Sequence, residues 1–179
     1  LNNDFHGANG PLKVSDPMYV VKGTDLYLKT MQGLGLPYNT DFNDGEQYGV
    51  GLMQLTTHYG KRCSAVDAFI EPLRKNKNLT IKLKSIVTKI IFEKNKAIGV
   101  EVLKNGKVEK YYANNQIIIT AGTYISPKIL MHSGIGDEKE LKKHDIRIKV
   151  NLKGVGKNLQ DHLEVPYVVS TKKGYGYFN

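Results

Sequence analysis

Five histidines and one cysteine are the side chains of this 179-residue sequence best suited to catalysis or metal binding. His162 follows Asp161, and a neighbouring carboxylate could orient its imidazole as a general base. The single cysteine, Cys63, excludes an internal disulfide and a cysteine-based metal cluster, and we interpret it as a small buried residue. From residue types alone we assign no catalytic residue and no metal site. The other histidines have no partner that the sequence identifies: His6, His58, His132 and His144.

The most informative pattern for ligand binding is an apolar segment that passes through a small-residue turn into a helix. Gln116–Thr120 is apolar without interruption at its centre, as expected of a strand buried on both faces. Ala121-Gly122 then forms a turn, and Ser126-Pro127 predicts the start of a helix over Lys128–His132. In open α/β sheets such a strand end and helix N-terminus bind nucleotides. Glycine turns also follow strands for structural reasons alone, so both interpretations stand at this point.

Three strands that precede this turn predict a β-meander in place of a crossover helix. Ile86–Phe92 is β-branched and apolar, and Ala97–Leu103 is its return strand. Asn105-Gly106 is a strong hairpin signal because both positions accept positive φ, and Lys107–Ala113 follows it. Leu79–Leu83 alternates as a further strand before the meander.

The remaining elements are shorter and separated by glycine-rich segments. Ser15 or Asp16 is predicted to cap the first helix, and Ser64 the second. The N-terminal elements expected are a strand over 10–16, a helix from 17 to 33 or 35, an ordered loop over 37–51, a strand over 50–57 and a helix over 64–73. The C-terminal elements expected are a helix over 138–144, a strand over 146–150, a loop over 154–162 and a strand over 165–170.

The chain is basic, with 26 Lys and Arg against 17 Asp and Glu, which gives a net charge of +9. Such a balance raises nucleic acid or an anionic surface as a partner. Nearly all of the positive charge is Lys, however, whereas base readout and bidentate phosphate contacts favour Arg. The lysines also stand singly or in pairs between apolar residues, as on solvated faces. We therefore predict no nucleic-acid partner and keep a complete, non-catalytic basic binding module as an alternative.

No apolar stretch approaches the roughly 18 residues that a membrane-spanning helix needs. We therefore predict no membrane span. No signal peptide is recognisable, and the first residue is Leu, which suggests truncation. The expected location is cytoplasmic, with membrane association left open.

Residues 122–136 resemble, position for position, the second signature of the glucose–methanol–choline oxidoreductases, in particular the choline-dehydrogenase-like branch. The segment reads GTYISPKILMHSGIG. Three further segments resemble the same family in the same order, so the resemblance covers nearly the whole chain. These segments are residues 6–15, residues 35–65 and residues 154–162.

This resemblance implies FAD as cofactor and a small-molecule alcohol as substrate, with hydride passing to flavin N5 while a histidine accepts the hydroxyl proton. Val87 matches a family valine whose backbone meets the adenine end of FAD. Thr120, Ala121 and Gly122 match the strand-end turn close to FAD, where small residues let the backbone approach a cofactor. The family places its proton-accepting histidine much nearer the C-terminus, so His162 is not expected to be catalytic.

The fold expected is α/β, more loosely α+β. A partial Rossmann-like FAD-binding domain with its β-meander is predicted over residues 76–149. A partial substrate domain built on antiparallel sheet is predicted over residues 1–75 and 150–179. The chain should therefore expose apolar surface that other elements normally cover.

Two essential parts of the family have no match in this sequence. They are the N-terminal Gly-x-Gly-x-x-Gly motif that holds the FAD pyrophosphate and the C-terminal region with the catalytic histidine. We therefore expect an internal fragment that is inactive alone. A flavin-containing cyanohydrin lyase of the same family is the alternative activity. Substrate identity, the choice between oxidase and dehydrogenase, and oligomeric state are not encoded in residues that we can recognise.

Overall fold

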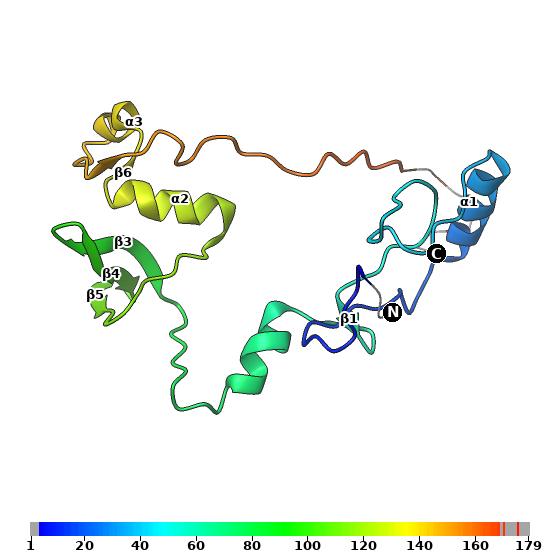
Figure 1. The fold of residues 1–179 in the computed structure, drawn as a ribbon, viewed down its shortest axis with the longest axis horizontal. Coiled ribbons are helices and arrows are strands. Elements are labelled where there is room, and N and C mark those ends of the chain that lie inside the picture. The colour runs from blue at the N-terminus through cyan, green and yellow to red at the C-terminus, as the bar shows by residue number, and fades with distance from the viewer. Residues whose placement is uncertain (1–3, 169, 171–174, 176–179) are drawn as a thin grey trace. The chain divides into compact units, whose positions relative to one another are not determined.

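The computed structural model describes residues 4–168, 170 and 175. They form two compact units (Figure 1). Unit 1 comprises the described residues up to Thr80 and those from Pro166 onward, and unit 2 comprises Ile81–Val165. Both helices and antiparallel sheets are present, so the predicted mixed α/β class is confirmed. The assignment of residues 1–75, 76–149 and 150–179 to substrate and FAD-binding domains stays a prediction.

Unit 2 is built on a three-stranded antiparallel meander of β3 (Ile86–Glu93), β4 (Lys96–Lys104) and β5 (Lys107–Tyr112), in that order. This confirms the predicted meander. The two-residue turn between β4 and β5 works because Asn105 and Gly106 adopt φ of 49° and 76°, which a hairpin of this type requires.

The remaining elements of unit 2 follow the meander in the sequence, and one of them, α2 (Gly122–His132), packs against β3. The others are β6 (Ile135–Gly136), α3 (Glu138–Lys143) and β7 (Val150–Asn151). β6 pairs with β7 in parallel. The buried apolar residues of this unit are Ile90 on β3, Val102 on β4, Ile129 on α2 and Leu141 on α3.

Two predictions in this region were wrong. α2 begins at Gly122 rather than at Lys128, so Pro127 lies inside the helix, where it removes one N–H donor from the backbone ladder. Gln116–Thr120 belongs to no strand of the described residues, and Ile118 is 72% exposed. A strand needs a neighbouring strand for its backbone hydrogen bonds, and within the described chain β3, β4 and β5 pair only with one another.

Unit 1 has less regular structure. Its elements are α1 (Lys22–Gly33), the two-residue strands β1 (Thr57–His58) and β2 (Lys61–Arg62), the π-helical turn η1 (Val66–Ile70) and the 3₁₀ turn η2 (Glu71–Leu73). The helix expected over 64–73 is thus a π-helical turn followed by a 3₁₀ turn. The Ser64 hydroxyl accepts the N–H of Asp67 at 3.3 Å, in line with its predicted capping role, and the Asp67 carboxylate, for which no role was predicted, accepts the N–H of Ser64 at 2.8 Å. Leu28 of α1, Val50, Cys63 and Ala68 are the buried apolar residues of unit 1.

Several shorter expectations in both units were also wrong. α1 begins at Lys22 instead of Pro17 and has no side-chain cap. The strand expected over 10–16 shrinks to a bridge between Ser15 and Leu55. The strand expected over 50–57 shrinks to that bridge, a second bridge between Val50 and Tyr38, and Thr57 in β1. Residues 79–83 form no strand, only Val150 of the segment 146–150 is in one, and the described part of 165–170 is in none; residue 169 lies outside the described residues. Pro11, Gly51 and Pro166 interrupt three of these patterns. Residues 79–83 and 146–150 contain neither glycine nor proline, and their patterns are too short to predict whether a neighbouring strand is available.

No helix in the described part of the chain combines the length and the apolar character that crossing a bilayer requires.

Candidate functional site

The N-terminus of α2 is the first part of the candidate cofactor site. Ala121 is the N-cap, with φ −81° and ψ 10°, and no side chain caps the first turn. The first backbone N–H groups of an α-helix have no partner within the helix, so this end favours an anionic group such as phosphate. Thr120, Ala121 and Gly122 are all exposed. The structure thus places the predicted turn directly at a helix N-terminus.

Position 122 favours glycine because of its backbone conformation and not because neighbouring atoms leave no room for a side chain. Its φ of +85° lies in the region that side chains rarely adopt, so the turn into α2 favours glycine. A Cβ built on Gly122 would meet no atom of the chain within 4 Å. The space beside this backbone is open, and a flat cofactor ring or a phosphate could approach it closely. These residues therefore fit a nucleotide cofactor.

Val87 lies on β3, the second element of the candidate site, opposite Val102 of β4. The register shifts between Val87 and Lys89, so Thr88 is an extra residue that bulges β3. The Thr88 hydroxyl donates to the backbone oxygen of Glu101 at 3.2 Å and to its carboxylate at 3.0 Å. These hydrogen bonds to β4 stabilise the bulge, and the bulge changes the direction of the β3 backbone next to Val87.

α2 and β3 are connected at one end by Ser133, which follows the last turn of α2. The backbone N–H of Ile90 donates to the Ser133 hydroxyl at 2.8 Å, and this hydroxyl donates to the carbonyl of Ile129 at 2.6 Å. The structure thus joins the two elements that carry the predicted FAD contacts, Val87 on one and Thr120, Ala121 and Gly122 beside the other. Contact of these four residues with FAD stays a prediction.

Gly134 fixes the next part of the chain. Its φ is +83°, and an added Cβ would lie 2.4 Å from the carbonyl oxygen of Arg147. The Gly134 carbonyl accepts hydrogen bonds from the N–H groups of Lys149 at 2.8 Å and Val150 at 3.1 Å. Only glycine allows so close an approach, which places β7 beside β6.

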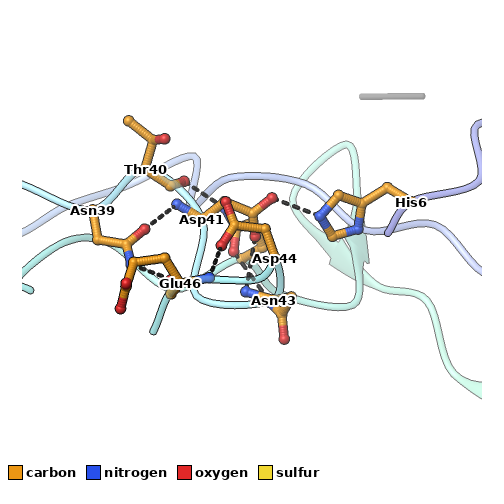
Figure 2. Close-up of polar contacts among 8 residues, drawn as sticks. His6, Asn39, Thr40, Asp41, Asn43, Asp44 and Glu46 are labelled. Atoms are coloured by element: carbon orange, nitrogen blue, oxygen red, sulfur yellow. Dashed lines mark hydrogen bonds and ion pairs between the residues drawn. The ribbon is translucent and has the colours of Figure 1, made fainter. Parts of the chain in front are cut away.

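Unit 1 contains a separate polar cluster in the loop over 37–51 (Figure 2). Asp41 is the buried charged residue among those that the structure describes, at 5% exposure. Its Oδ2 lies 2.6 Å from Nε2 of His6, and its Oδ1 accepts the N–H of Asn43 at 2.9 Å. The Asn39 side chain in turn accepts the N–H of Asp41 at 2.7 Å. The cluster lines a groove of about 910 Å³ between residues 5–16 and residues 40–56.

The charge of Asp41 is favoured by its neighbours. The N–H of Asn43 has the largest effect and holds the pKa of the Asp41 carboxyl below its usual value, against the opposing cost of desolvation. The hydrogen bond and positive charge of His6 act in the same direction. These bonds favour the ionised form of Asp41, so the loop retains a charged acceptor for the N–H of Asn43 and the ring of His6.

Sequence reasoning had found no partner for His6, because Asp41 lies 35 residues away. The alternation of Asn39, Asp41 and Asn43 would have been a usable signal, since side chains of this type bond the backbone two residues on. His144 lies near a carboxylate too, with its Nε2 3.8 Å from Oε1 of Glu140, but both side chains are exposed. Asp161 accepts the backbone N–H of His162 at 2.8 Å, and the exposed ring of His162 is not oriented by it. Cys63 is buried, as predicted, and its sulfur accepts the N–H of Lys13 at 3.3 Å.

Known proteins resemble the chain along most of its length. The family model described as "GMC oxidoreductase" matches residues 2–164. Human mitochondrial choline dehydrogenase is 40% identical over 166 residues, which cover 90% of this chain and 27% of the relative. An oxygen-dependent choline dehydrogenase of Rhizobium meliloti is 37% identical over 174 residues, or 94% of this chain and 31% of the relative.

Solved structures of an oxidase and of an FAD-dependent oxidoreductase also resemble this chain. The pyridoxine 4-oxidase of Mesorbium loti superposes with a TM-score of 0.81 at 34% identity, over 88% of this chain and 31% of its own. An FAD-dependent oxidoreductase of Chaetomium thermophilum gives 0.81 at 31% identity, over 87% of this chain and 27% of its own. The chain thus spans less than a third of the proteins that it resembles. With the signature over residues 122–136 placed on α2 and its C-terminal junction, the chain belongs to the GMC oxidoreductase family.

Proposed function

We propose that this chain is an internal segment of an FAD-dependent oxidoreductase that acts on CH–OH groups of a choline-type alcohol. The proposal is supported most directly by α2, which begins at the positive-φ Gly122 with open space beside it and carries the family signature. Relatives named choline dehydrogenase share 36–40% of its residues. In this proposal Val87, Thr120, Ala121 and Gly122 contact FAD through their backbone.

Flavin bound at this site would supply the hydride acceptor for alcohol oxidation. The residues of this chain would bind and orient it. The uncapped N-terminus of α2 offers backbone N–H donors to an anionic group, and Gly122 leaves room for close approach. The bulged β3 presents the backbone of Val87. The proton acceptor and the pyrophosphate-binding motif would come from other parts of the longer protein.

The first test is to sequence the DNA on either side of this segment in frame and to purify the protein that it encodes. We expect a protein with bound FAD whose visible flavin absorption bleaches when choline is added without oxygen. The 179-residue chain alone should not reduce a dye with choline or other alcohols. A purified longer protein that lacks flavin would contradict the proposal.

The same experiment separates the alternatives. A cyanohydrin lyase would hold flavin that no alcohol bleaches, and it would release cyanide from a cyanohydrin. A basic binding module would bind DNA or anionic lipid with strong salt dependence and no flavin. Membership of the family favours the flavoenzyme. The family match does not support a cytoplasmic location, since one relative is named as mitochondrial. It does not bear on the oligomeric state.

A further inference from the structure

Ser133 makes more hydrogen bonds than a helix cap requires. Its backbone N–H donates to the carbonyl oxygens of Ile129 at 3.1 Å and Leu130 at 3.0 Å, which completes the last turn of α2. Its hydroxyl donates to the Ile129 carbonyl at 2.6 Å and at the same time accepts the N–H of Ile90 at 2.8 Å. The last of these bonds leaves the helix and reaches the neighbouring sheet.

The N–H of Ile90 needs this partner because β3 is an edge strand. The sheet order is β3-β4-β5, so no strand among the described residues pairs with the other side of β3. Ile90 is only 7% exposed, and a buried backbone N–H without an acceptor costs free energy. Ile129, at 6% exposure, lies one turn before Ser133 on α2 and belongs to the same buried set of unit 2. The Ser133 hydroxyl therefore connects the end of α2 to the edge strand β3, next to the buried residues Ile90 and Ile129.

We propose that Ser133 is a positioning residue: its hydroxyl fixes the end of α2 to the edge of β3 and so sets the placement of Gly122 relative to Val87. The proposal rests on the proposed function, since these two residues are its predicted FAD contacts. α2 spans 11 residues from Gly122 to His132, so a shift at its C-terminal end is passed along the helix to its N-terminal turn, past the one hydrogen bond that Pro127 removes.

A serine that only capped α2 would behave differently. Removal of its hydroxyl would then disturb the last turn of the helix and leave β3 and Gly122 where they are. The positioning role predicts that changes reach Ile90 and Val87 on β3, and Gly122 at the far end of α2. Backbone amide signals of these three residues therefore distinguish the two roles without any cofactor.

The first experiment compares the 179-residue chain with Ser133→Ala, Ser133→Thr and a control, Ser126→Ala, by amide NMR and hydrogen exchange. Ser126 lies on the same helix, and its hydroxyl makes no hydrogen bond to β3 in the described structure. In Ser133→Ala we expect exchange of the Ile90 amide to accelerate about tenfold, which corresponds to about 1.4 kcal/mol. The amide signals of Val87 and Gly122 should shift. Ser133→Thr keeps a hydroxyl and should restore the Ile90 protection and both signals.

Unchanged signals of Val87 and Gly122 in Ser133→Ala would overturn the proposal, even if Ile90 exchanges faster. Shifts of equal size in Ser126→Ala would overturn it as well. If Ser133→Ala does not fold, Ser133→Cys takes its place, because a thiol is a weak donor and acceptor. Full protection of Ile90 in the cysteine variant would then contradict a hydrogen-bonded link.

The second experiment uses the longer holoenzyme and measures the dissociation constant of FAD. Ser133→Ala should weaken FAD binding about tenfold, with affinity restored in Ser133→Thr and unchanged in Ser126→Ala. Equal affinity in Ser133→Ala and the unchanged protein would overturn the positioning role. Absence of FAD from the unchanged protein would contradict the proposed function instead, while the NMR result would still decide whether Ser133 positions α2.

Discussion

The meander of unit 2 and the loop over 37–51 of unit 1 are stabilised in opposite ways. In the meander, β3, β4 and β5 satisfy one another's backbone groups along strands of eight, nine and six residues. In the loop, side-chain oxygens accept the backbone N–H groups. Asn39, Asp41, Asp44 and Glu46 accept from the residues two positions after them.

This difference predicts how each region responds to substitution. A ladder of backbone bonds is independent of most exposed side chains, so the meander should tolerate changes outside its core. Each side-chain acceptor in the loop is unique, and its loss leaves a backbone N–H unsatisfied. The loop should therefore be sensitive residue by residue, while the meander should be sensitive only at its buried positions.

The largest effect is expected at Gly51 in the loop. A Cβ at this position would lie 2.0 Å from the carbonyl oxygen of Asn39, which is backbone and cannot move aside. We expect Gly51→Ala to lower the free energy of unfolding of unit 1 by about 4 kcal/mol. Chemical denaturation followed by NMR of unit 1 signals would measure this. Gly10→Ala is the control, since its Cβ would meet nothing within 4 Å; equal effects at both positions would contradict the packing shown at Gly51.

The next largest effect is expected in the core of unit 2. Leu141 of α3 is 1% exposed, so Leu141→Ala removes buried methyl groups and leaves a cavity. The expected loss in the free energy of unfolding is about 3 kcal/mol. Thermal or chemical unfolding of unit 2 would report it. Leu163→Ala, at a residue 96% exposed, should change the free energy by less than about 0.5 kcal/mol. A similar loss in both variants would mean that Leu141 is not a core residue.

A pH-dependent effect should separate the two regions. The folded-state pKa of Asp41 lies below its usual value of 3.8, so its carboxylate stabilises the loop above that pH. This contribution is lost as the pH falls through the lowered value. In His6→Gln the pKa of Asp41 should rise but stay below 3.8, because the N–H of Asn43 has the larger effect. An NMR titration of the carboxyl carbon would measure both midpoints.

Asp137 in unit 2 provides the matched control for this titration. Its pKa is also lowered, chiefly by the backbone N–H of Glu140 at the start of α3, and His6 takes no part. His6→Gln should therefore leave the Asp137 midpoint unchanged. An equal rise at Asp41 and Asp137 would show a general change in charge and not the loss of one hydrogen bond.

The smallest effect is expected on the exposed surface of the meander. Lys104 and Lys107 are directly opposite each other beside the β4–β5 turn, whereas Lys110 is opposite Glu101. Lys104→Glu converts a like-charge pair into an opposite pair and should raise the free energy of unfolding by about 0.5 kcal/mol. Lys110→Glu should lower it by a similar amount. Both changes should shrink in high salt, and equal changes of the same sign would contradict the register.

The sequence was most predictive where structure is local. Asn105-Gly106 predicted the β4–β5 turn, because asparagine and glycine readily adopt the positive φ that both positions require. Ser64 alone indicated the start of the helical segment that contains η1, and its hydroxyl accepts the N–H of Asp67. The strands β3 and β4 followed from their apolar and β-branched residues, whereas their buried residues, Ile90 and Val102, were identified only in the structure.

Elements that depend on distant partners could not be predicted. Gln116–Thr120 has the composition of a buried strand, but only a neighbouring strand could make it one, and the described residues offer none. The parallel pair β6–β7 depends on the close approach of Gly134 to Arg147, which no local pattern reveals. At the candidate site, the turn at Gly122 was found from sequence. The link from Ser133 to Ile90, across 43 residues, needed the structure.

The meander also has a consequence for folding kinetics. Each of its strands pairs with the next along the chain, through turns of two residues. Its contact order is therefore low, and isolated hairpins form within about 1–10 μs. Ribosomes add only about 5–20 residues each second. The three strands can pair as soon as Tyr112 has left the exit tunnel, so β3 would be ready as a template before α2 and Ser133 have emerged from it.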